Sequence, residues 1–360
     1  MDGRHSRRIG RCPLGAHRGG TARRTLGADC RRRRRVRVDR SWRSLRAAGR
    51  LTVRVHLVGL GAVGAGYGSR MLAAGVDLKV VADPERAAKY RREASVVNGV
   101  EYHFPVLATG DRTPAEVVVV AVKYPALAEA IELIAPNIAE GTVILSLLNG
   151  IDSERVLAKA FPQAQVLLSV TVGIDAVRVG RQVRYTSLGR IIFGEATNGV
   201  EPTAAVAKLA GLLAESGIDA SVAPDMLHQL WWKFLINVGV NQVSAVLGAP
   251  YLAFQTPDAP AREAMISAQR EVIAVANAEG IGLGERDLEA WLEVLAKLGP
   301  DNYTSMAQDA LAGRETEVDV FAGRVCELGR KHDIATPVNE LLRQLLKAAT
   351  NSPPRTAGQT

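Results

Sequence analysis

Residues 52–64 read TVRVHLVGLGAVG, an alternating run of β-branched side chains that leads into a glycine-rich turn. The alternation predicts a β-strand as far as Val58, and the run from the glycines to Ala74 is compatible with a helix. Gly75 is placed to end this helix, and a second strand follows from Leu78 to Ala82. The sequence therefore predicts one βαβ unit with a glycine-rich turn after its first strand.

The glycine turn has the GxGxxG spacing that is typical of dinucleotide-binding proteins. The first glycine permits a sharp turn, the second lets the backbone approach a pyrophosphate, and the third lets the helix pack closely on the strand. A glycine turn without a ligand is the alternative, but the strand before it and the helix after it favour a dinucleotide. We therefore expect cofactor contacts from Gly59, Leu60, Gly61, Ala62, Val63 and Gly64.

The preference between NAD and NADP is open at this point. Asp83 follows the second strand, where an acidic side chain normally binds the ribose hydroxyls of NAD. Arg86, with Arg91 and Arg92 further along, would instead suit the 2′-phosphate of NADP. Asp83 ahead of Pro84 is also a good helix N-cap, which is compatible with either cofactor.

Strand and helix patterns alternate up to about residue 222. Further strands are expected at 117–122, 142–147 and 166–170, with a hairpin at Asn98-Gly99 and antiparallel edge strands at 183–185 and 190–194. From Pro224 onward the pattern is helical. We predict an α/β protein with an N-terminal Rossmann-type, doubly wound parallel sheet over residues 51–222 and an all-helical C-terminal domain over 223–350, followed by a frayed tail at 351–360.

The net charge of +8 is an average over two dissimilar pieces. Residues 1–50 contain 17 Arg, no Lys and 3 Asp, a net +14, whereas the other 310 residues carry a net −6. Such a segment is expected to be disordered. A start codon placed too early best explains it, with a transit peptide and a polyanion-binding arm as alternatives. Because the remaining chain is mildly acidic, nucleic-acid binding is not expected of it.

The composition excludes several classes of protein. No stretch approaches the ~18 apolar residues of a membrane-spanning helix. The three cysteines, Cys12, Cys30 and Cys326, form neither a disulfide framework nor a CxxC metal site. We therefore expect a cytoplasmic protein without a metal. The apolar helical part allows a homodimer as well as internal burial.

Two polar residues follow predicted neighbouring strands. Lys123 ends the first strand, and Asn149 lies in the Leu-Asn-Gly that ends the next. Ligands of open α/β sheets bind beyond these strand ends, so we expect both side chains to face the nicotinamide half of the cofactor. A surface lysine and a turn asparagine are the simpler alternatives.

The sequence LWWKFLINVGVNQVS at 230–244 predicts a helix that is apolar nearly all round and hence buried. Lys233, Asn237 and Asn241 recur at every fourth position, so they form one polar stripe. Buried polar groups need partners, and a bound polar substrate would supply them. The alternative is a lysine that reaches water beside two asparagines in helix contacts.

Two later segments, TSMAQD at 304–309 and GRETEVD at 313–319, contain Ser305 and Glu317. No spacing rule brings these two residues together. On pattern alone, Glu317 is a solvated carboxylate at a helix start.

Together with GLGAVG, LWWKFLINVGVNQVSA and the TPVN at 336–339, these motifs resemble the ketopantoate reductase (2-dehydropantoate 2-reductase) family over about residues 51–349. The resemblance implies NADPH-dependent reduction of 2-dehydropantoate to (R)-pantoate, on the route to pantothenate and coenzyme A. It implies a catalytic role for Lys233, substrate binding by Asn149, Asn237, Asn241 and Ser305, and a place near the cofactor for Lys123, Asn149, Ala176 and Glu317. Asp83 departs from the arginine that NADPH-dependent members commonly carry at that position, so NADH stays a possible cofactor.

The expected reaction is hydride transfer to the carbonyl of a small 2-oxo acid, with Lys233 as the general acid. Two other readings stay open. One is a related reductase with a different 2-oxo acid, and the other is a nucleotide-binding protein of the same fold without turnover.

Overall fold

The N-terminal half is built on a seven-stranded sheet in the order β11-β10-β7-β6-β5-β1-β2, seen in the computed structural model, which describes residues 53–108 and 110–350. Its strands are β1 Arg54–Val58, β2 Asp77–Val81, β5 Val117–Val120, β6 Val143–Ser146, β7 Gln165–Ile174, β10 Leu188–Gly194 and β11 Ala220–Val222. The five from β2 to β7 are mutually parallel, and β10 runs antiparallel to β7. The predicted Rossmann-type parallel sheet is confirmed.

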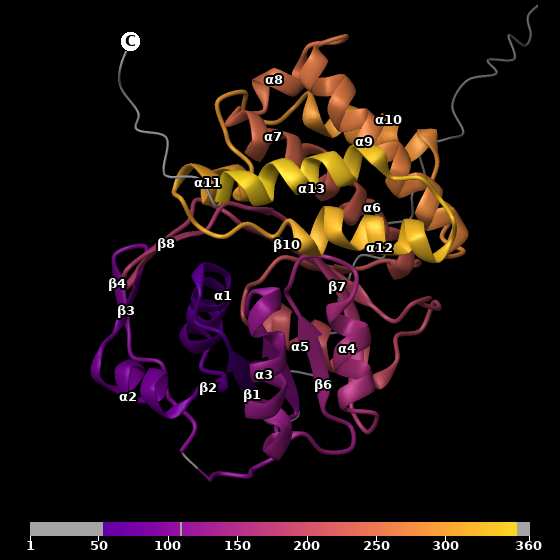
Figure 1. Ribbon diagram of the computed structural model, residues 1–360. Coiled ribbons are helices and arrows are strands. Elements are labelled where there is room, and N and C mark those ends of the chain that lie inside the picture. The colour runs from indigo at the N-terminus through magenta and orange to yellow at the C-terminus, as the bar shows by residue number, and fades with distance from the viewer. Residues whose placement is uncertain (1–52, 109, 351–360) are drawn as a thin grey trace, which may run out of the picture. The chain divides into compact units, whose positions relative to one another are not determined.

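Helices cover both faces of this sheet (Figure 1). They are α1 Ala62–Ala73, α2 Pro84–Arg92, α3 Leu127–Ile134, α4 Ser153–Ala160 and α5 Ala204–Glu215, with 3₁₀ turns η3 Tyr124–Ala126 and η4 Ala135–Asn137. In β5, Val117 and Val119 pack toward α1 and α5, while Val118 and Val120 pack toward α3 and α4. Each buried valine stabilises the fold by roughly 1.5–3 kcal/mol, which explains the unbroken apolar run in a strand covered on both faces.

A separate four-stranded sheet has the order β4-β3-β9-β8. Its strands are β3 Ser95–Val97, β4 Val100–Tyr102, β8 Val177–Val179 and β9 Gln182–Arg184. Asn98 and Gly99, with φ of 48° and 84°, make the predicted hairpin between β3 and β4.

The two predicted antiparallel edge strands need correction. β9 pairs antiparallel with β8 and β10 pairs antiparallel with β7, as predicted, but neither is an edge strand. β9 also pairs in parallel with β3 inside the small sheet, and β10 is covered on its outer side by β11. The short Ala-Ser-Val run of β11 has no clear alternation, so its pairing depends on the neighbouring β10 rather than on a local pattern.

The C-terminal half is helical, as predicted, and its helices gather apart from the sheet (Figure 1). They are α6 Met226–Ile236, η5 Asn237–Asn241, α7 Gln242–Leu247, α8 Leu252–Gln255, α9 Pro260–Ala278, α10 Glu285–Leu295, α11 Ser305–Leu311, η6 Asp319–Gly323, α12 Arg324–Lys331 and α13 Pro337–Thr350. The π-helical segments η5 and η6 were not predicted. Between residues 53 and 350, no helix is long and apolar enough to cross a membrane.

Separate hydrophobic clusters fill the two halves, those of the sheet half made of residues up to Val222 and that of the helical half made largely of residues from Trp231 onward. Both halves belong to one compact unit. The expectations for residues 1–50 and 351–360 lie outside the described residues.

Candidate active site

A cavity of about 730 Å³ lies beyond the carboxyl ends of β1, β5 and β6, where residues of the helical half also border it. This volume is in the usual range for a small-molecule site, and the position is the usual one in open α/β sheets. Of the residues predicted from the sequence, the cavity brings together Gly59, Leu60, Gly61, Ala62, Val63, Lys123, Asn149, Ala176, Ser305 and Glu317.

The three glycines of the turn meet different surroundings. Gly59 has a φ of 97°, and a Cβ there would lie 2.5 Å from the carbonyl oxygen of Ala121. A Cβ at Gly64 would lie 1.9 Å from the Gly59 carbonyl oxygen, whereas at Gly61 no heavy atom would lie within 4 Å. Gly59 and Gly64 therefore permit close packing, and Gly61 leaves the N-terminus of α1 open to a pyrophosphate.

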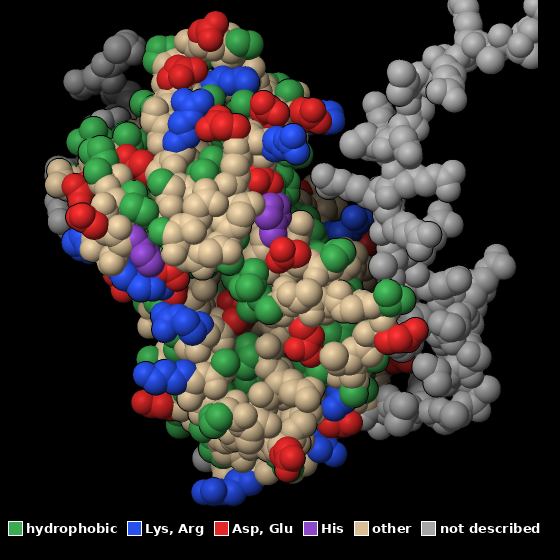
Figure 2. Space-filling model, turned by 90° about the vertical axis from the view of Figure 1, so that its right-hand side faces the viewer, with side chains coloured by type: hydrophobic (Ala, Val, Ile, Leu, Met, Phe, Trp, Pro, Cys, Tyr) green, Lys and Arg blue, Asp and Glu red, His purple; other side chains and the backbone are tan. Residues whose placement is uncertain are grey.

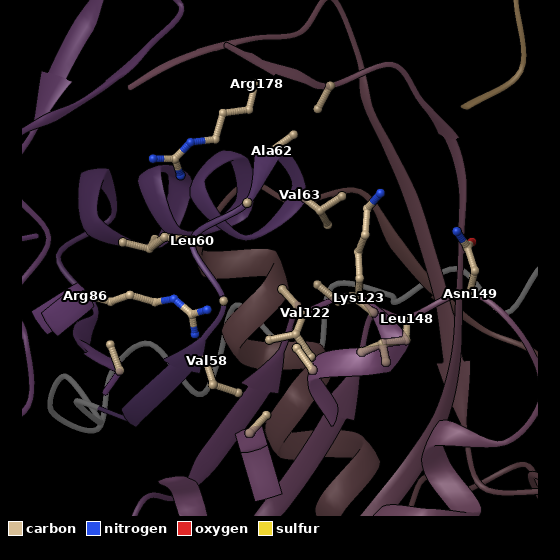
Figure 3. Close-up of a pocket in the computed structure, with 18 of the residues that line it drawn as sticks. Val58, Leu60, Ala62, Val63, Arg86, Val122, Lys123, Leu148, Asn149 and Arg178 are labelled. Atoms are coloured by element: carbon tan, nitrogen blue, oxygen red, sulfur yellow. The ribbon is translucent and has the colours of Figure 1, made fainter. Parts of the chain in front are cut away.

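Arg86 and Arg178 line one end of the cavity, on the same side as Leu60 in Figure 3. Asp83 does not line it. One oxygen of the Asp83 carboxylate accepts the Arg86 backbone N–H at 2.9 Å and so caps α2, and the other lies 3.3 Å from the Arg86 guanidinium. Arg86 also pairs with Glu129 at 3.0 Å. The Asp83 carboxylate, which would bind the ribose hydroxyls in an NAD site, thus contacts Arg86 of α2 instead.

At the other end of the cavity, Lys123 and Asn149 extend from the strand-end loops (Figure 3). The Lys123 ammonium lies 3.0 Å from Asp309 in α11. The Asn149 amide donates to Glu317 at 2.8 Å, and burial raises the pKa of Glu317 while this hydrogen bond lowers it. Both contacts join the sheet half to the helical half beside the cavity. Glu317 is therefore a partly buried hydrogen-bond acceptor rather than the solvated carboxylate that its pattern indicated.

The polar stripe on the long buried helix is present. Asn237 and Asn241 are buried at 3% and 6% exposure, and Lys233 lies one turn before them on α6. Burial lowers the pKa of Lys233 to about 8. Within residues 53–108 and 110–350, no hydrogen bond or ion pair reaches the Lys233 ammonium or either asparagine side chain. Lys233 is thus partly buried and the two asparagines are buried, and none of the three has a protein partner, an arrangement that suits a polar ligand.

The π-helical turn η5 straightens this stripe. Four residues of an α-helix exceed a full turn by about 40°, so an uninterrupted α-helix would turn Asn241 well away from Lys233. The wider turn over Asn237–Asn241 advances less per residue and removes part of that drift. Such turns occur often at functional sites.

The stripe does not line the cavity that contains the glycine turn. It approaches the cavity through neighbouring elements, since α11, which begins at Ser305, contacts η5, and α6 packs against β7, which leads to Ala176. The structure therefore brings ten predicted residues to one cavity and places Lys233, Asn237 and Asn241 in the adjacent helical layer.

Sequence reasoning missed Arg178, Gln308 and Arg314, which also line the cavity. Arg178 lies on the small sheet, and no local pattern marks it. Gln308 and Arg314 lie in the TSMAQD and GRETEVD segments that the sequence analysis had selected. Their positions next to Ser305 and Glu317 could therefore have indicated them. Among the described residues, no cluster of His, Cys, Asp or Glu is arranged to hold a metal ion.

Comparison with known proteins gives a consistent result for both halves. Family models described as ketopantoate reductase PanE/ApbA and as its C-terminal part match residues 55–198 and 225–350. The 2-dehydropantoate 2-reductase of Halobacterium salinarum is 32% identical over 236 residues, which are 65% of this chain and 76% of that protein. The chain belongs to the ketopantoate reductase family. It is accordingly a 2-dehydropantoate 2-reductase-like, NAD(P)-dependent oxidoreductase.

Solved structures agree with membership of the ketopantoate reductase family. The 2-dehydropantoate 2-reductase from Geobacter metallireducens superposes with a TM-score of 0.70 at 28% identity, over 82% of this chain and 99% of that one. A D-mandelate dehydrogenase solved with NADH and anilino(oxo)acetate has the same fold, with a TM-score of 0.73 at 24% identity over 83% of this chain and 98% of that one. The cofactor of this chain is a nicotinamide dinucleotide.

Proposed function

We propose that this protein reduces 2-dehydropantoate to (R)-pantoate, a step toward pantothenate and coenzyme A, with Lys233 as the general acid. The observation that carries the proposal is the Lys233 ammonium, which burial brings to a pKa of about 8 and which no described residue pairs. A cation kept in this state near neutral pH is suited to donating a proton. Family membership supplies the substrate class.

The proposed roles follow from these surroundings. When bound, the reduced nicotinamide supplies the hydride to the C2 carbonyl of the oxo acid. Lys233 hydrogen-bonds the C2 oxygen and gives it a proton as negative charge develops there. Asn237, Asn241 and Ser305 bind the carboxylate and hydroxyl of the substrate, and Asn149 holds Glu317 beside the reacting groups.

The glycine turn fits a dinucleotide, because Gly61 leaves open space at the start of α1 and no acidic side chain lies in the first turn of that helix. The helix N-terminus therefore favours the negative charge of a pyrophosphate. Lys123 adds a cation at the next strand end, where its ammonium is more than half exposed.

An activity assay tests the reaction directly. The protein is incubated with 2-dehydropantoate and NADPH or NADH, and consumption of the reduced nicotinamide is followed by absorbance. Pyruvate and 2-oxoisovalerate serve as comparison oxo acids, because both lack the hydroxymethyl group that 2-dehydropantoate carries at C3. Turnover highest with 2-dehydropantoate supports the proposal, and higher turnover with either comparison acid contradicts the proposed substrate.

We further propose NADPH as the preferred cofactor. Asp83 caps α2 and pairs with Arg86 outside the cavity lining, while Arg86, Arg178 and the Glu129 paired with Arg86 line this end of the cavity. The two guanidinium groups outnumber the one carboxylate there, which favours a 2′-phosphate. Arg178→Ala should lower kcat/KM for NADPH by roughly tenfold, the size of one charge-assisted hydrogen bond, and should leave NADH use unchanged. Arg181→Ala, an exposed arginine of the same small sheet paired with Glu101, is the matched control. An equal loss with both cofactors would contradict the assignment.

A further inference from the structure

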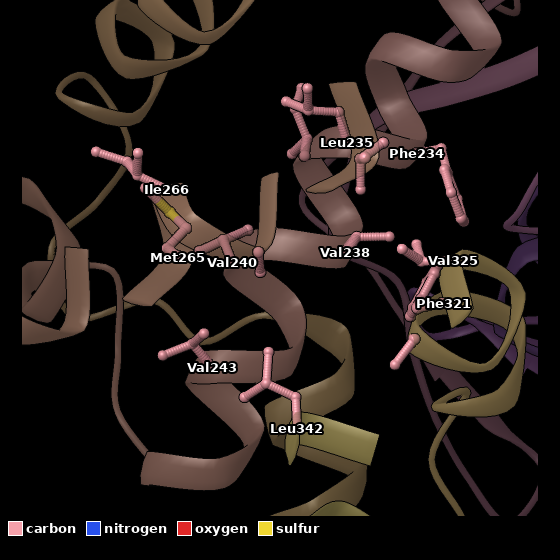
Figure 4. Close-up of a cluster of buried hydrophobic side chains, with 14 of the residues drawn as sticks. Phe234, Leu235, Val238, Val240, Val243, Met265, Ile266, Phe321, Val325 and Leu342 are labelled. Carbon is pink, nitrogen blue, oxygen red and sulfur yellow. The ribbon is translucent and has the colours of Figure 1, made fainter. Parts of the chain in front are cut away.

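The two π-helical turns of the helical half lie against each other. Val238 of η5 and Phe321 of η6 belong to one hydrophobic cluster, and Figure 4 shows Phe321 and Val325 beside Val238 and Phe234. The rings of Phe234 and Phe321 have centroids 6.4 Å apart. Both turns adjoin the site, because η5 contains Asn237 and Asn241 and η6 begins two residues after Glu317.

The π turn of η6 frees a backbone donor. Gly323 N–H bonds the Val318 carbonyl at 3.0 Å, a bond that spans five residues. In an α-helix that carbonyl would accept from Ala322 instead. The Ala322 N–H donates to the side-chain oxygen of Gln242 at 3.1 Å, and Gln242 has no exposed surface. A residue 80 positions away thus satisfies the donor that the π turn leaves.

The other end of the Gln242 amide holds η5. Its nitrogen donates to the Val238 carbonyl at 2.7 Å and to the Asn339 side-chain oxygen at 3.1 Å. Asn339 is also fully buried, and its own amide nitrogen donates to Glu271 at 2.7 Å. Because the chain of bonds starts at a backbone N–H and ends at a carboxylate, only one orientation of the Gln242 amide satisfies all its partners.

We propose that Gln242 is a positioning residue that joins the turn bearing Asn237 and Asn241 to the segment bearing Glu317, and so fixes the substrate-binding amides relative to the cofactor side of the site. This inference rests on the proposed reduction of a 2-oxo acid. Gln242 lines no part of the cavity, so it acts through its partners Val238, Ala322 and Asn339.

The consequence is selective. Loss of the Gln242 contacts loosens the substrate amides, whereas the glycine turn belongs to the sheet half and keeps its own contacts with Ala121 and α1. A displacement of about 1 Å in a substrate-binding group is enough to lower catalysis by up to ~10²-fold. The KM for the oxo acid therefore depends on Gln242, and the affinity for the dinucleotide does not.

Two variants separate the two ends of the amide. Gln242→Leu removes both the acceptor oxygen and the donor nitrogen of the amide. The nearly isosteric Gln242→Glu keeps an acceptor for the Ala322 N–H but removes the donor to Val238 and Asn339. Gln255→Leu is the matched control, because the Gln255 amide nitrogen also donates to two acceptors, the backbone carbonyls of Leu295 and Leu298 at 2.9 and 2.8 Å, elsewhere in the helical half. For all three we would measure the KM for 2-dehydropantoate, the Kd for NADPH, and amide hydrogen exchange.

We expect Gln242→Leu to raise the KM by at least ~10-fold with the Kd for NADPH within about twofold of wild type. In Gln242→Leu, the backbone amides of both 234–243 and 317–323 should exchange faster than in wild type. In Gln242→Glu, only those of 234–243 should exchange faster. In Gln255→Leu, exchange should change in neither segment. An unchanged KM in Gln242→Leu, or an equal rise in Gln255→Leu, would overturn the proposal. If the wild-type protein does not reduce 2-dehydropantoate, the proposed function fails, and the exchange pattern alone still decides whether Gln242 joins the two turns.

Discussion

The strand-end loops of the sheet half and the polar stripe of the helical half use the same kinds of side chain in opposite ways. Lys123 is more than half exposed and paired with Asp309, whereas Lys233 is unpaired and burial lowers its pKa to about 8. Asn149 donates to Glu317, whereas the Asn237 side chain has no partner within the described residues. The paired groups hold the two halves together, and the unpaired ones are available to a small molecule. Substitutions in the two regions should therefore affect different quantities.

The largest expected effect is at the unpaired lysine. Lys233→Ala removes the proposed proton donor, so kcat for oxo-acid reduction should fall by about 10²- to 10⁴-fold. The Kd for NADPH, measured by fluorescence titration, should not change. Lys208→Ala, at a partly exposed lysine in α5, serves as the control. Turnover within about threefold of wild type in Lys233→Ala would contradict the role of this lysine.

The pH dependence of turnover follows from the lowered pKa of Lys233. A general acid acts in its protonated form, so kcat/KM for the oxo acid, which reports the pKa values of the free enzyme, should be constant below a pH of about 8 and fall about tenfold per pH unit above it. The same burial favours the neutral amine in the folded state, so Lys233 adds stability as pH rises from about 8 toward the ordinary lysine value of 10.5. A pH–rate profile of Lys123→Ala should show the same fall, since that lysine is not the proton donor. A profile that stays flat to pH 10 would refute the assignment.

A smaller effect is expected at the unpaired amide. Asn237→Ala removes no protein hydrogen bond of the side chain, so the midpoint of urea unfolding should barely move. The KM for the oxo acid should rise about tenfold, since one substrate hydrogen bond is lost. A large loss of stability without a change in KM would show that Asn237 is structural.

The smallest effect on turnover is expected at Asn149, the amide that is paired with Glu317. Its substitution should affect stability more than Asn237→Ala does. Asn149→Ala leaves the partly buried Glu317 without its donor and should lower the free energy of unfolding by about 1–3 kcal/mol. Loss of this bond also raises the pKa of Glu317 further, so the destabilisation should grow as pH rises and the carboxyl ionises. In the double variant Asn149→Ala/Glu317→Gln, position 317 has no carboxyl group to ionise, so the destabilisation should no longer increase with pH. Urea unfolding at several pH values measures both effects, and equal stability of Asn149→Ala and wild type would break the contrast between the two regions.

Much of the sheet half could be predicted from the sequence because its signals are local. The βαβ unit shows alternation, a glycine turn and a stop at Gly75, all within about 30 residues, and each appears where expected. Lys123 and Asn149 were placed by the rule that parallel strands end at one edge. Asp83 was weighed both as a ribose contact and as an N-cap, and the structure shows it in the second arrangement.

The helical half could be predicted only in outline. Its helix breaks follow Gly and Pro and were predicted. The π-helical turns η5 and η6, by contrast, are bonded by glutamines from distant helices: Gln242 accepts the Ala322 N–H, and Gln269 donates to the Leu235 carbonyl. No pattern within a short window contains such partners. For the same reason the hydrogen bond that makes Glu317 a partly buried acceptor was not foreseen, and neither was the contribution of Arg178.

The small sheet has a kinetic consequence. β3 pairs with β9, and the paired residues Val96 and Gln182 are separated in the sequence by three strands of the large sheet, β5, β6 and β7. Closing so long a loop costs entropy that only later contacts offset, so this sheet should form after the strands between its two halves have assembled. Because Arg178 lies on β8 of this sheet, the end of the cavity that it lines should be completed late in folding. A nascent chain would then gain its full affinity for the dinucleotide only after β5, β6 and β7 have paired.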